Sequence, residues 1–238
     1  MRLDDPGVVR RDYADESRLA ARASAWQYAS GPDPRDLVVE AFAEVAPRRV
    51  LDVGSGRGEL AERLQAELGC AVLAVDQSER MVELTRARGV AAELGDVQSL
   101  RFEDASFEAA LAAWMLYHVP DLDAGLAELA RVLRPGGRLV AVTNASANLP
   151  ELWNLVGGRD DLAGSFSAEN GAKRLERHFA RVTWRDAAGT LTFPDRAAAR
   201  EYVAASIVRA DDADRLPGWQ GPLVCTRLAR VFVAETAA

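Results

Sequence analysis

The sequence has 238 residues, of which 49% are hydrophobic and 27% charged, with a formal net charge of -7 and two cysteines. This length and composition are typical of one globular domain with a full core. The acidic balance argues against a nucleic acid as the main partner, because backbone phosphates bind surfaces rich in lysine and arginine.

Cysteine use and hydropathy indicate the compartment. Cys70 and Cys225 are far apart and have no metal-like spacing. No apolar stretch approaches the roughly 18 residues of a membrane span, and the charged N-terminus lacks an apolar signal core. We therefore expect a cytoplasmic protein without disulfides, metal or membrane contact, acting as a monomer or homodimer.

The first part of the chain alternates between helices and short apolar strands. In chain order, the expected elements are helices at 11–30 and 34–47, then strand 49–53, helix 58–68, strand 71–76, helix 78–89, strand 91–96, segment 107–116, helix 123–137 and strand 138–145. The alanines of segment 107–116 leave it open between strand and helix. Such alternation with short connections predicts a parallel sheet with helices on both faces.

The C-terminal part is less regular. We expect helices at 167–179 and 195–206 and strands at 181–187, 189–193 and 230–235. The acidic run at 209–214 is expected to be a solvated loop, because no nearby histidine or glycine-spaced loop supports a metal site.

A glycine-rich turn, "VLDVGSGRGEL", follows the first buried strand. Its glycines, Gly54, Gly56 and Gly58, have the spacing Gly-x-Gly-x-Gly. A dinucleotide fold needs its third glycine where Glu59 stands, and the turn has no lysine for a phosphate loop. Asp52 adds negative charge beside the turn, which favours a cationic ligand over a pyrophosphate.

Two further carboxylates end the next strands. Asp76, about 20 residues beyond the turn, is placed to accept both hydroxyls of a ribose; a helix cap or a surface acid is the alternative. Asp96 is placed to accept a hydrogen bond from an exocyclic amine, with Val97 and Met81 as apolar walls for a purine. The alternative for Asp96 is an ordinary loop-starting aspartate.

These motifs together resemble one known family. "VLDVGSGRGEL", "AVDQSERMV", "GDVQSLRFEDASFEAALAAWMLYHV" and "LARVLRPGGRLV" are similar, in order and spacing, to the motifs of class I S-adenosylmethionine-dependent methyltransferases of the small-molecule type, akin to the ubiquinone-biosynthesis methyltransferases. The resemblance covers residues 48–145.

The resemblance implies a fold. We expect an α/β, Rossmann-like, doubly wound seven-stranded sheet, mostly parallel, with the last strand antiparallel and residues 230–235 as the candidate for it. The single domain 1–238 would consist of a helical cap at 1–47, the cofactor-binding core at 48–145 and the rest of the sheet, with cap insertions, at 146–238.

The resemblance also implies the cofactor contacts. Asp52, Gly54, Ser55 and Gly56 would face the methionine part of S-adenosylmethionine, and Asp76 its ribose. The other expected contacts are Gln77 and Met81 beside the adenosine, Asp96 and Val97 at the adenine, and the Ala113 carbonyl at the methionine amino group. This chain has Ala112-Ala113-Trp114 where many relatives carry a polar residue, which leaves the backbone contact but removes a side-chain one.

Candidate acceptor residues follow the fourth strand or lie in the cap. His118 stands at the carboxyl edge of the sheet with a suitable pKa for a general base; a structural role is the equal alternative. His178 is expected to be structural. The aromatic candidates for the acceptor pocket are Tyr13, Trp26, Trp114 and Tyr117, with Tyr28 and Trp153 also in cap segments, and helix packing explains the cap residues equally well.

The leading hypothesis is a methyltransferase acting on oxygen, nitrogen or carbon of a small-molecule acceptor. An RNA methyltransferase would show a basic face interleaved with aromatic residues. A non-catalytic S-adenosylmethionine-binding module would bind the cofactor and release no product. Glu59 argues against an NAD-linked oxidoreductase.

Overall fold

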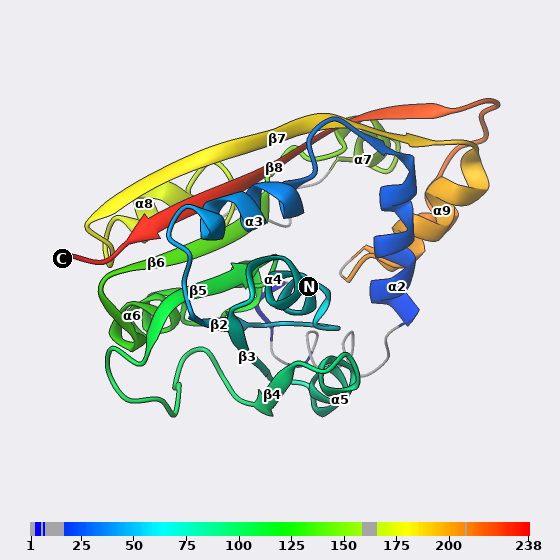
Figure 1. Ribbon diagram of the computed structural model, residues 1–238. Coiled ribbons are helices and arrows are strands. Elements are labelled where there is room, and N and C mark those ends of the chain that lie inside the picture. The colour runs from blue at the N-terminus through cyan, green and yellow to red at the C-terminus, as the bar shows by residue number, and fades with distance from the viewer. Residues whose placement is uncertain (1–2, 6, 8–16, 159–165, 208) are drawn as a thin grey trace.

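The computed structural model describes residues 3–5, 7, 17–158, 166–207 and 209–238. Its centre is an eight-stranded sheet with the order β1-β7-β8-β6-β5-β2-β3-β4 (Figure 1). The neighbouring pairs among β2 to β6 are parallel, so their carboxyl ends meet at one edge. These strands are β2 (Arg49–Val53), β3 (Ala71–Asp76), β4 (Ala91–Leu94), β5 (Phe107–Ala113) and β6 (Leu133–Asn144).

Two long strands complete the core of the sheet. β8 (Leu223–Glu235) is antiparallel to β6 and to β7 (Arg181–Phe193). The predicted doubly wound, mostly parallel sheet with an antiparallel last strand is therefore confirmed. Residues 181–193 form one continuous strand rather than the two predicted, because Gly189 stays paired with Arg227 across the ladder.

The predicted number of seven strands is wrong by one. The additional strand is β1 (Ala29–Ser30), which pairs antiparallel with Leu191 and Thr190 of β7. These two residues were expected at the end of a helix. Gly31 follows with φ +87°, a left-handed backbone conformation that glycine adopts readily, and it turns the chain from β1 toward the next helix.

Helices cover both faces of the sheet, as predicted (Figure 1). Buried side chains of α3 (Pro34–Ala43), α4 (Glu59–Leu68) and α5 (Glu79–Ala87) pack against one face. Those of α6 (Leu122–Val132) and α8 (Gly171–Leu175) pack against the other. Alternate residues of β6 belong to the two cores, as strand geometry requires.

Local sequence signals set several helix starts. The side chains of Asp33, Ser78, Asp121 and Asp195 accept hydrogen bonds from backbone N–H groups in the first turns of α3, α5, α6 and α9 (Arg196–Ala204). Such caps stabilise a helix by about 1 kcal/mol each. The helix expected at 167–179 is the short α8, flanked by turns.

The ambiguous segment 107–116 forms β5. It lies between β2 and β6, and its alanines Ala109, Ala110 and Ala112 are fully buried. Small side chains fit a strand that is covered on both faces by helices, so tertiary packing decides against the helical preference of alanine.

The cap has a hydrophobic core of its own. It combines α7 (Pro150–Asn154), α9 and η3 (Ala210–Arg215) with the distal ends of β7 and β8. The N-terminal α2 (Ser17–Ser24) and η1 (Ala25–Tyr28) lie on this side (Figure 1). The acidic run 209–214 is not the expected solvated loop, because η3 buries Asp212, whose carboxylate pairs with Arg209 and Arg215.

Candidate functional site

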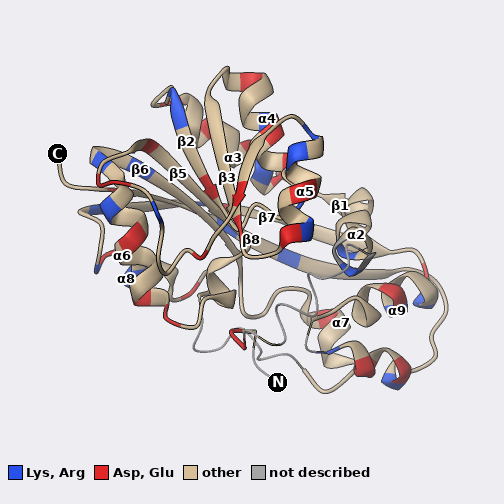
Figure 2. Ribbon diagram, turned by 90° about the horizontal axis from the view of Figure 1, so that it is seen from below, with Lys and Arg blue, Asp and Glu red and all other residues tan. Residues whose placement is uncertain are grey.

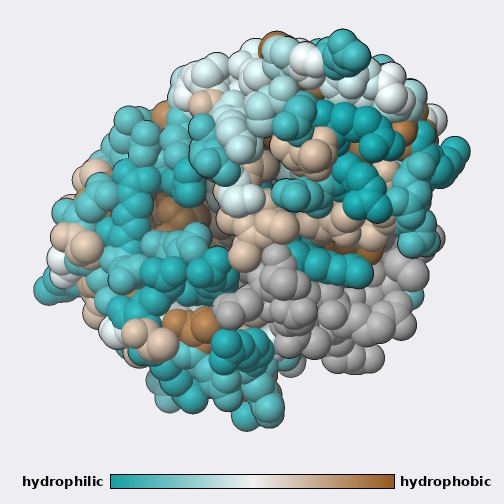
Figure 3. All heavy atoms as spheres, turned by 90° about the vertical axis from the view of Figure 1, so that its right-hand side faces the viewer, coloured by the Kyte–Doolittle hydropathy of each residue, from teal (hydrophilic) through white to brown (hydrophobic). Residues whose placement is uncertain are grey.

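A cavity of about 370 Å³ lies at the carboxyl ends of β2 to β5, under the cap. Residues of α2, η1 and α9 complete its wall. Figure 3 shows hydrophobic residues recessed in a largely hydrophilic surface on the side of α2 and α9. Among the described residues, every predicted site residue lines this cavity except Met81. The site therefore stands where ligands bind open α/β sheets.

The glycine turn is fixed by its neighbours. Gly54, Gly56 and Gly58 all have positive φ values, of 65°, 55° and 76°. The Gly54 N–H donates to the Val75 carbonyl at 2.7 Å. A Cβ at Gly54 would stand 2.7 Å from Cβ of Met115, and one at Gly58 would stand 2.8 Å from the Thr85 side chain. The turn thus needs glycine for conformation and for close approach.

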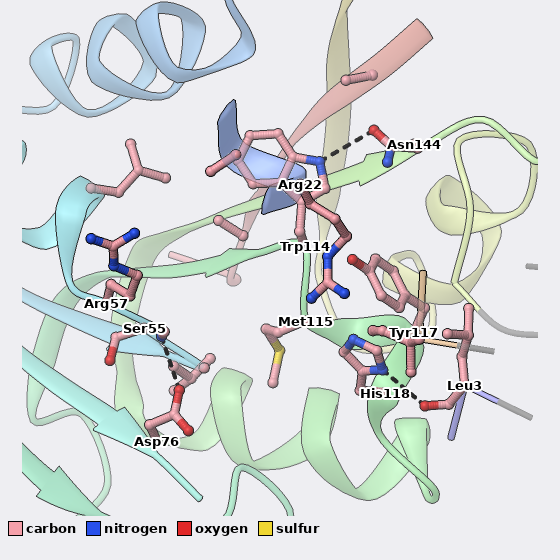
Figure 4. A pocket seen from close by; sticks show the side chains of 18 of the residues that line it. Leu3, Arg22, Ser55, Arg57, Asp76, Trp114, Met115, Tyr117, His118 and Asn144 are labelled. Carbon is pink, nitrogen blue, oxygen red and sulfur yellow. Dashed lines mark hydrogen bonds between the residues drawn. The ribbon is translucent and has the colours of Figure 1, made fainter. Parts of the chain in front are cut away.

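Asp76 holds the turn from the next strand. Its carboxylate accepts hydrogen bonds from the backbone N–H of Gly56 and of Ser78, each at 2.9 Å. Burial raises the pKa of Asp76, and these two donors act in the opposite direction. The carboxylate faces the cavity with its remaining acceptor capacity (Figure 4).

Asp52 is a second buried carboxyl at the same end of the cavity. Burial, and secondarily the charge of Asp76, raise the pKa of Asp52 to about 8. The side chain lines the cavity with a relative exposure of 2%. A cation bound nearby would favour the ionised form and lower this pKa.

The adenine end of the predicted site is more open. Asp96 is exposed and accepts from the backbone N–H and side-chain amide of Gln98. Val97, Gln98 and Gln77 line the wall beside it. Met81, predicted beside the adenosine, is fully buried in the first turn of α5 and is not among the residues that line the cavity.

His118 lies at the other end, in η2 (Leu116–His118), and is buried with a relative exposure of 7%. Its Nδ1 is 2.8 Å from the Leu3 carbonyl. A carbonyl only accepts, so Nδ1 carries the hydrogen and, in the neutral ring, Nε2 carries the lone pair. The Tyr117 ring packs edge-on at 4.4 Å between centroids. His118 is thus held as an Nδ1–H tautomer at the cavity wall (Figure 4).

Trp114 follows Ala113 at the end of β5 and has φ +53°, which is rare for a bulky residue. Its N–H donates to the Val142 carbonyl at 2.8 Å, and its indole N–H donates to Oδ1 of Asn144 at 3.2 Å. Its ring meets Trp26 edge-on at 6.3 Å. The two predicted aromatic residues therefore form one wall, built from segments almost ninety positions apart in the sequence.

Several lining residues were missed by sequence reasoning: Arg57, Met115, Asn144, Asn148, Tyr202 and Arg227. Asn144 could have been predicted by the argument used for His118, because it lies at the carboxyl end of a parallel strand. Arg227 had no local signal. It is buried on β8 and donates to the carbonyls of Ser30 and Pro32, at 3.0 and 2.7 Å.

The remaining expectations concern residues outside the site. Tyr13 lies outside the described residues. His178 contacts Asp123 at 3.2 Å, away from the cavity. Within the described ranges, no group of three or more histidine, cysteine, aspartate or glutamate side chains is arranged to hold a metal. None of the described helices combines the length and the apolar character needed to cross a membrane.

Comparison with known proteins gives consistent results. Residues 51–141 match the family model of a methyltransferase domain. The chain is 34% identical over 180 residues to an uncharacterized methyltransferase of Mycobacterium bovis, covering 72% of each. It is 37% identical over 141 residues to a ubiquinone biosynthesis O-methyltransferase of Xanthomonas oryzae pv. oryzae, covering 53% of this chain and 59% of that one.

Solved structures share the fold. A phosphoethanolamine N-methyltransferase 2 of Haemonchus contortus, in complex with phosphomonomethylethanolamine and S-adenosylhomocysteine, aligns with a TM-score of 0.66 and 16% identity. The alignment covers 100% of this chain and 61% of that one. At this identity the likeness concerns the fold.

Proposed function

Because this chain belongs to the S-adenosylmethionine-dependent methyltransferases, we propose that it methylates a small-molecule acceptor in the cavity at the carboxyl ends of β2 to β5. The observation that carries the proposal is that the predicted cofactor carboxylates and His118 line one shared cavity. The cytoplasmic location and the independence from metal that we expect from the sequence remain part of the proposal.

The residues present fit a cationic nucleoside without phosphate. Asp52 and Asp76 bring buried carboxyls to the turn, and Asp96 lies at the open end. The Ser55 hydroxyl oxygen is buried and has no hydrogen-bond partner among the described residues, which suits a site that takes a polar ligand. In the proposal, Asp76 holds the ribose, Asp96 the adenine amine, and the turn with Asp52 and Ala113 the methionine part.

When bound, S-adenosylmethionine supplies a methyl group activated by its sulfonium. The chain itself binds and aligns two reactants and keeps water away from them, since proximity and alignment account for much of such a rate. The aromatic wall of Trp26 and Trp114 supports this shielding role. For an acceptor that must lose a proton, Nε2 of His118 is the group placed to take it.

A small molecule is favoured over RNA by charge and by enclosure. Basic and acidic segments are interspersed over the helices in Figure 2, rather than gathered in a basic face. An RNA site needs a basic, aromatic-interleaved surface. The acceptor candidates among the described residues line a cavity under the cap, which supports a small molecule over an extended strand.

The test is calorimetric titration with S-adenosylhomocysteine, followed by a metabolite screen read as S-adenosylhomocysteine release from S-adenosylmethionine. We expect binding, loss of binding in Asp52→Ala, and turnover with at least one small acceptor. Binding without turnover on any acceptor, including RNA, would favour the non-catalytic module. No binding by the intact protein would refute the proposal.

A further inference from the structure

Charge is divided unequally between the two ends of the cavity. Four described carboxylates line the cavity, from β2, the start of α4, the end of β3 and the loop after β4: Asp52, Glu59, Asp76 and Asp96. The described lining residues of α2, η1, η2, α9 and β8 and of the segment after β6 include no aspartate or glutamate. We call the part of the cavity that these elements line the acceptor end.

Two asparagines give the acceptor end a definite hydrogen-bonding character. Oδ1 of Asn148 accepts from the Leu228 N–H at 2.9 Å, and Oδ1 of Asn144 accepts from the Trp114 indole at 3.2 Å. Both donors are N–H groups, so each must contact the amide oxygen of its asparagine and not the amide nitrogen. The Nδ2 groups of both asparagines have no hydrogen-bond partner among the described residues, and both residues line the cavity. Each therefore offers N–H donors to a ligand.

Two arginines add positive charge. Figure 4 shows the Arg22 guanidinium near Met115 and His118, and its Nη1 donates to the Ala205 carbonyl at 2.5 Å. Arg227 is 4% exposed, its described hydrogen bonds all go to backbone carbonyls, and its Nε is buried without a partner in the part of the chain described. A protonated amine at this end would meet cations and N–H donors and no described carboxylate.

Building on the proposed methyltransferase function, we infer that the acceptor presents oxygen: an uncharged or anionic hydroxyl compound with a neighbouring carbonyl or carboxylate, methylated on the hydroxyl oxygen. The amides of Asn144 and Asn148 donate to its oxygens, the charges of the two arginines favour a ligand that is not cationic, and the wall formed by Trp26 and Trp114 contacts its apolar part. In the transfer an O–CH3 bond forms, the sulfonium S–CH3 bond breaks with its electron pair going to sulfur, and the hydroxyl proton goes to Nε2 of His118.

Ligand charge provides the first test, in the complex with S-adenosylhomocysteine. The probes are 2-hydroxybenzoate and 2-hydroxybenzylamine, which share a ring and a hydroxyl and differ in the sign of the side-group charge. We expect 2-hydroxybenzoate to bind about tenfold or more tightly. Absence of 2-hydroxybenzoate binding, or equal or tighter binding of the amine, would overturn the inference.

The Asn148→Asp variant tests the donor directly. An aspartate keeps an oxygen for the Leu228 N–H and replaces the amide donor by a carboxylate oxygen, so the fold is preserved. We expect about tenfold weaker binding of 2-hydroxybenzoate, with the affinity for S-adenosylhomocysteine unchanged. Asn154→Asp makes the same charge change at an exposed position outside the cavity and is the matched control.

The outcomes separate the two proposals. Unchanged or tighter 2-hydroxybenzoate binding in Asn148→Asp, or an equal loss in Asn154→Asp, overturns the acceptor assignment and leaves the methyltransferase function in place. If the unmodified protein does not bind S-adenosylhomocysteine, the methyltransferase function itself is contradicted.

Discussion

The backbone N–H of Gly56 donates a 2.9 Å hydrogen bond to the carboxylate of Asp76, twenty residues further along the chain. This bond ties the glycine turn after β2 to the end of β3. The carboxylate proposed to hold the ribose thus also fixes the turn proposed to hold the methionine part. The two functions of Asp76 are coupled through one side chain.

Replacing Asp76 by alanine should therefore lower both ligand affinity and stability. Two part-buried N–H groups lose their acceptor, and an unpaired buried group costs about 1–3 kcal/mol. We expect the affinity for S-adenosylhomocysteine to fall by more than about tenfold, measured by calorimetry, with a lower urea midpoint. Asp104→Ala, at an exposed ion pair with Arg131, is the control. Wild-type affinity in Asp76→Ala would contradict the assignment.

Gly54 and Gly69 have nearly equal φ values but different surroundings. Comparing alanine substitutions at the two positions therefore separates the cost of the left-handed backbone from the cost of a steric clash. Gly54 and Gly69 have φ values of 65° and 66°, but a Cβ would meet Met115 at Gly54 and nothing within 4 Å at Gly69. We expect Gly69→Ala to lose about 1 kcal/mol of unfolding free energy from the left-handed conformation. Gly54→Ala should lose more and also bind S-adenosylhomocysteine less tightly. Equal stability losses with unaltered binding would show that Met115 gives way.

The raised pKa of Asp52 predicts that the stability of the fold depends on pH. Its pKa of about 8 in the fold lies above its ordinary value of 3.8, so between these pH values the folded chain binds more protons than the unfolded one. The free energy of unfolding therefore falls as pH rises through this window, by on the order of a few kcal/mol. Asp52→Asn should flatten the decline, measured by urea unfolding from pH 5 to 9. A parallel decline in the variant would assign it to other groups.

The same carboxyl predicts proton release on ligand binding. A bound cation favours ionised Asp52, so binding of S-adenosylmethionine at pH 7 should release a proton from Asp52. Calorimetry in buffers of different protonation enthalpy measures this release. It should be absent in Asp52→Asn, provided that the variant still binds at the concentrations used.

His118→Gln tests the base. Glutamine keeps a donor for the Leu3 carbonyl and lacks the basic ring nitrogen. With an acceptor that must lose a proton, kcat should fall about 100-fold or more, while the affinity for S-adenosylhomocysteine stays. His178→Gln, at a contact with Asp123 away from the cavity, should change neither quantity. An unchanged pH–rate profile in His118→Gln would remove His118 from proton transfer.

Much of the cofactor end could be predicted because its signals are local. Asp52, Asp76 and Asp96 stand at or just beyond the ends of β2, β3 and β4, and parallel strands bring those ends to one edge. The burial of Met81 away from the cavity lining could not be predicted, because helix periodicity alone does not decide which residues of α5 the fold buries. β5 was ambiguous because alanine fits both a helix and a covered strand.

The sequence by itself determined the alternation of strands and helices, the Gly-x-Gly-x-Gly turn and the carboxylates at the strand ends, because these depend on backbone sterics and on residue spacing within a few positions. Tertiary structure decided the acceptor end. Trp26 reaches Trp114 only because β1 pairs with β7 and Arg227 holds the carbonyls of Ser30 and Pro32. Likewise, the bond from the Leu228 N–H to Oδ1 of Asn148 leaves the amide donor of Asn148 available to a ligand. These contacts join residues 80 to 197 positions apart. Local conformational preferences do not specify which distant residues will come into contact.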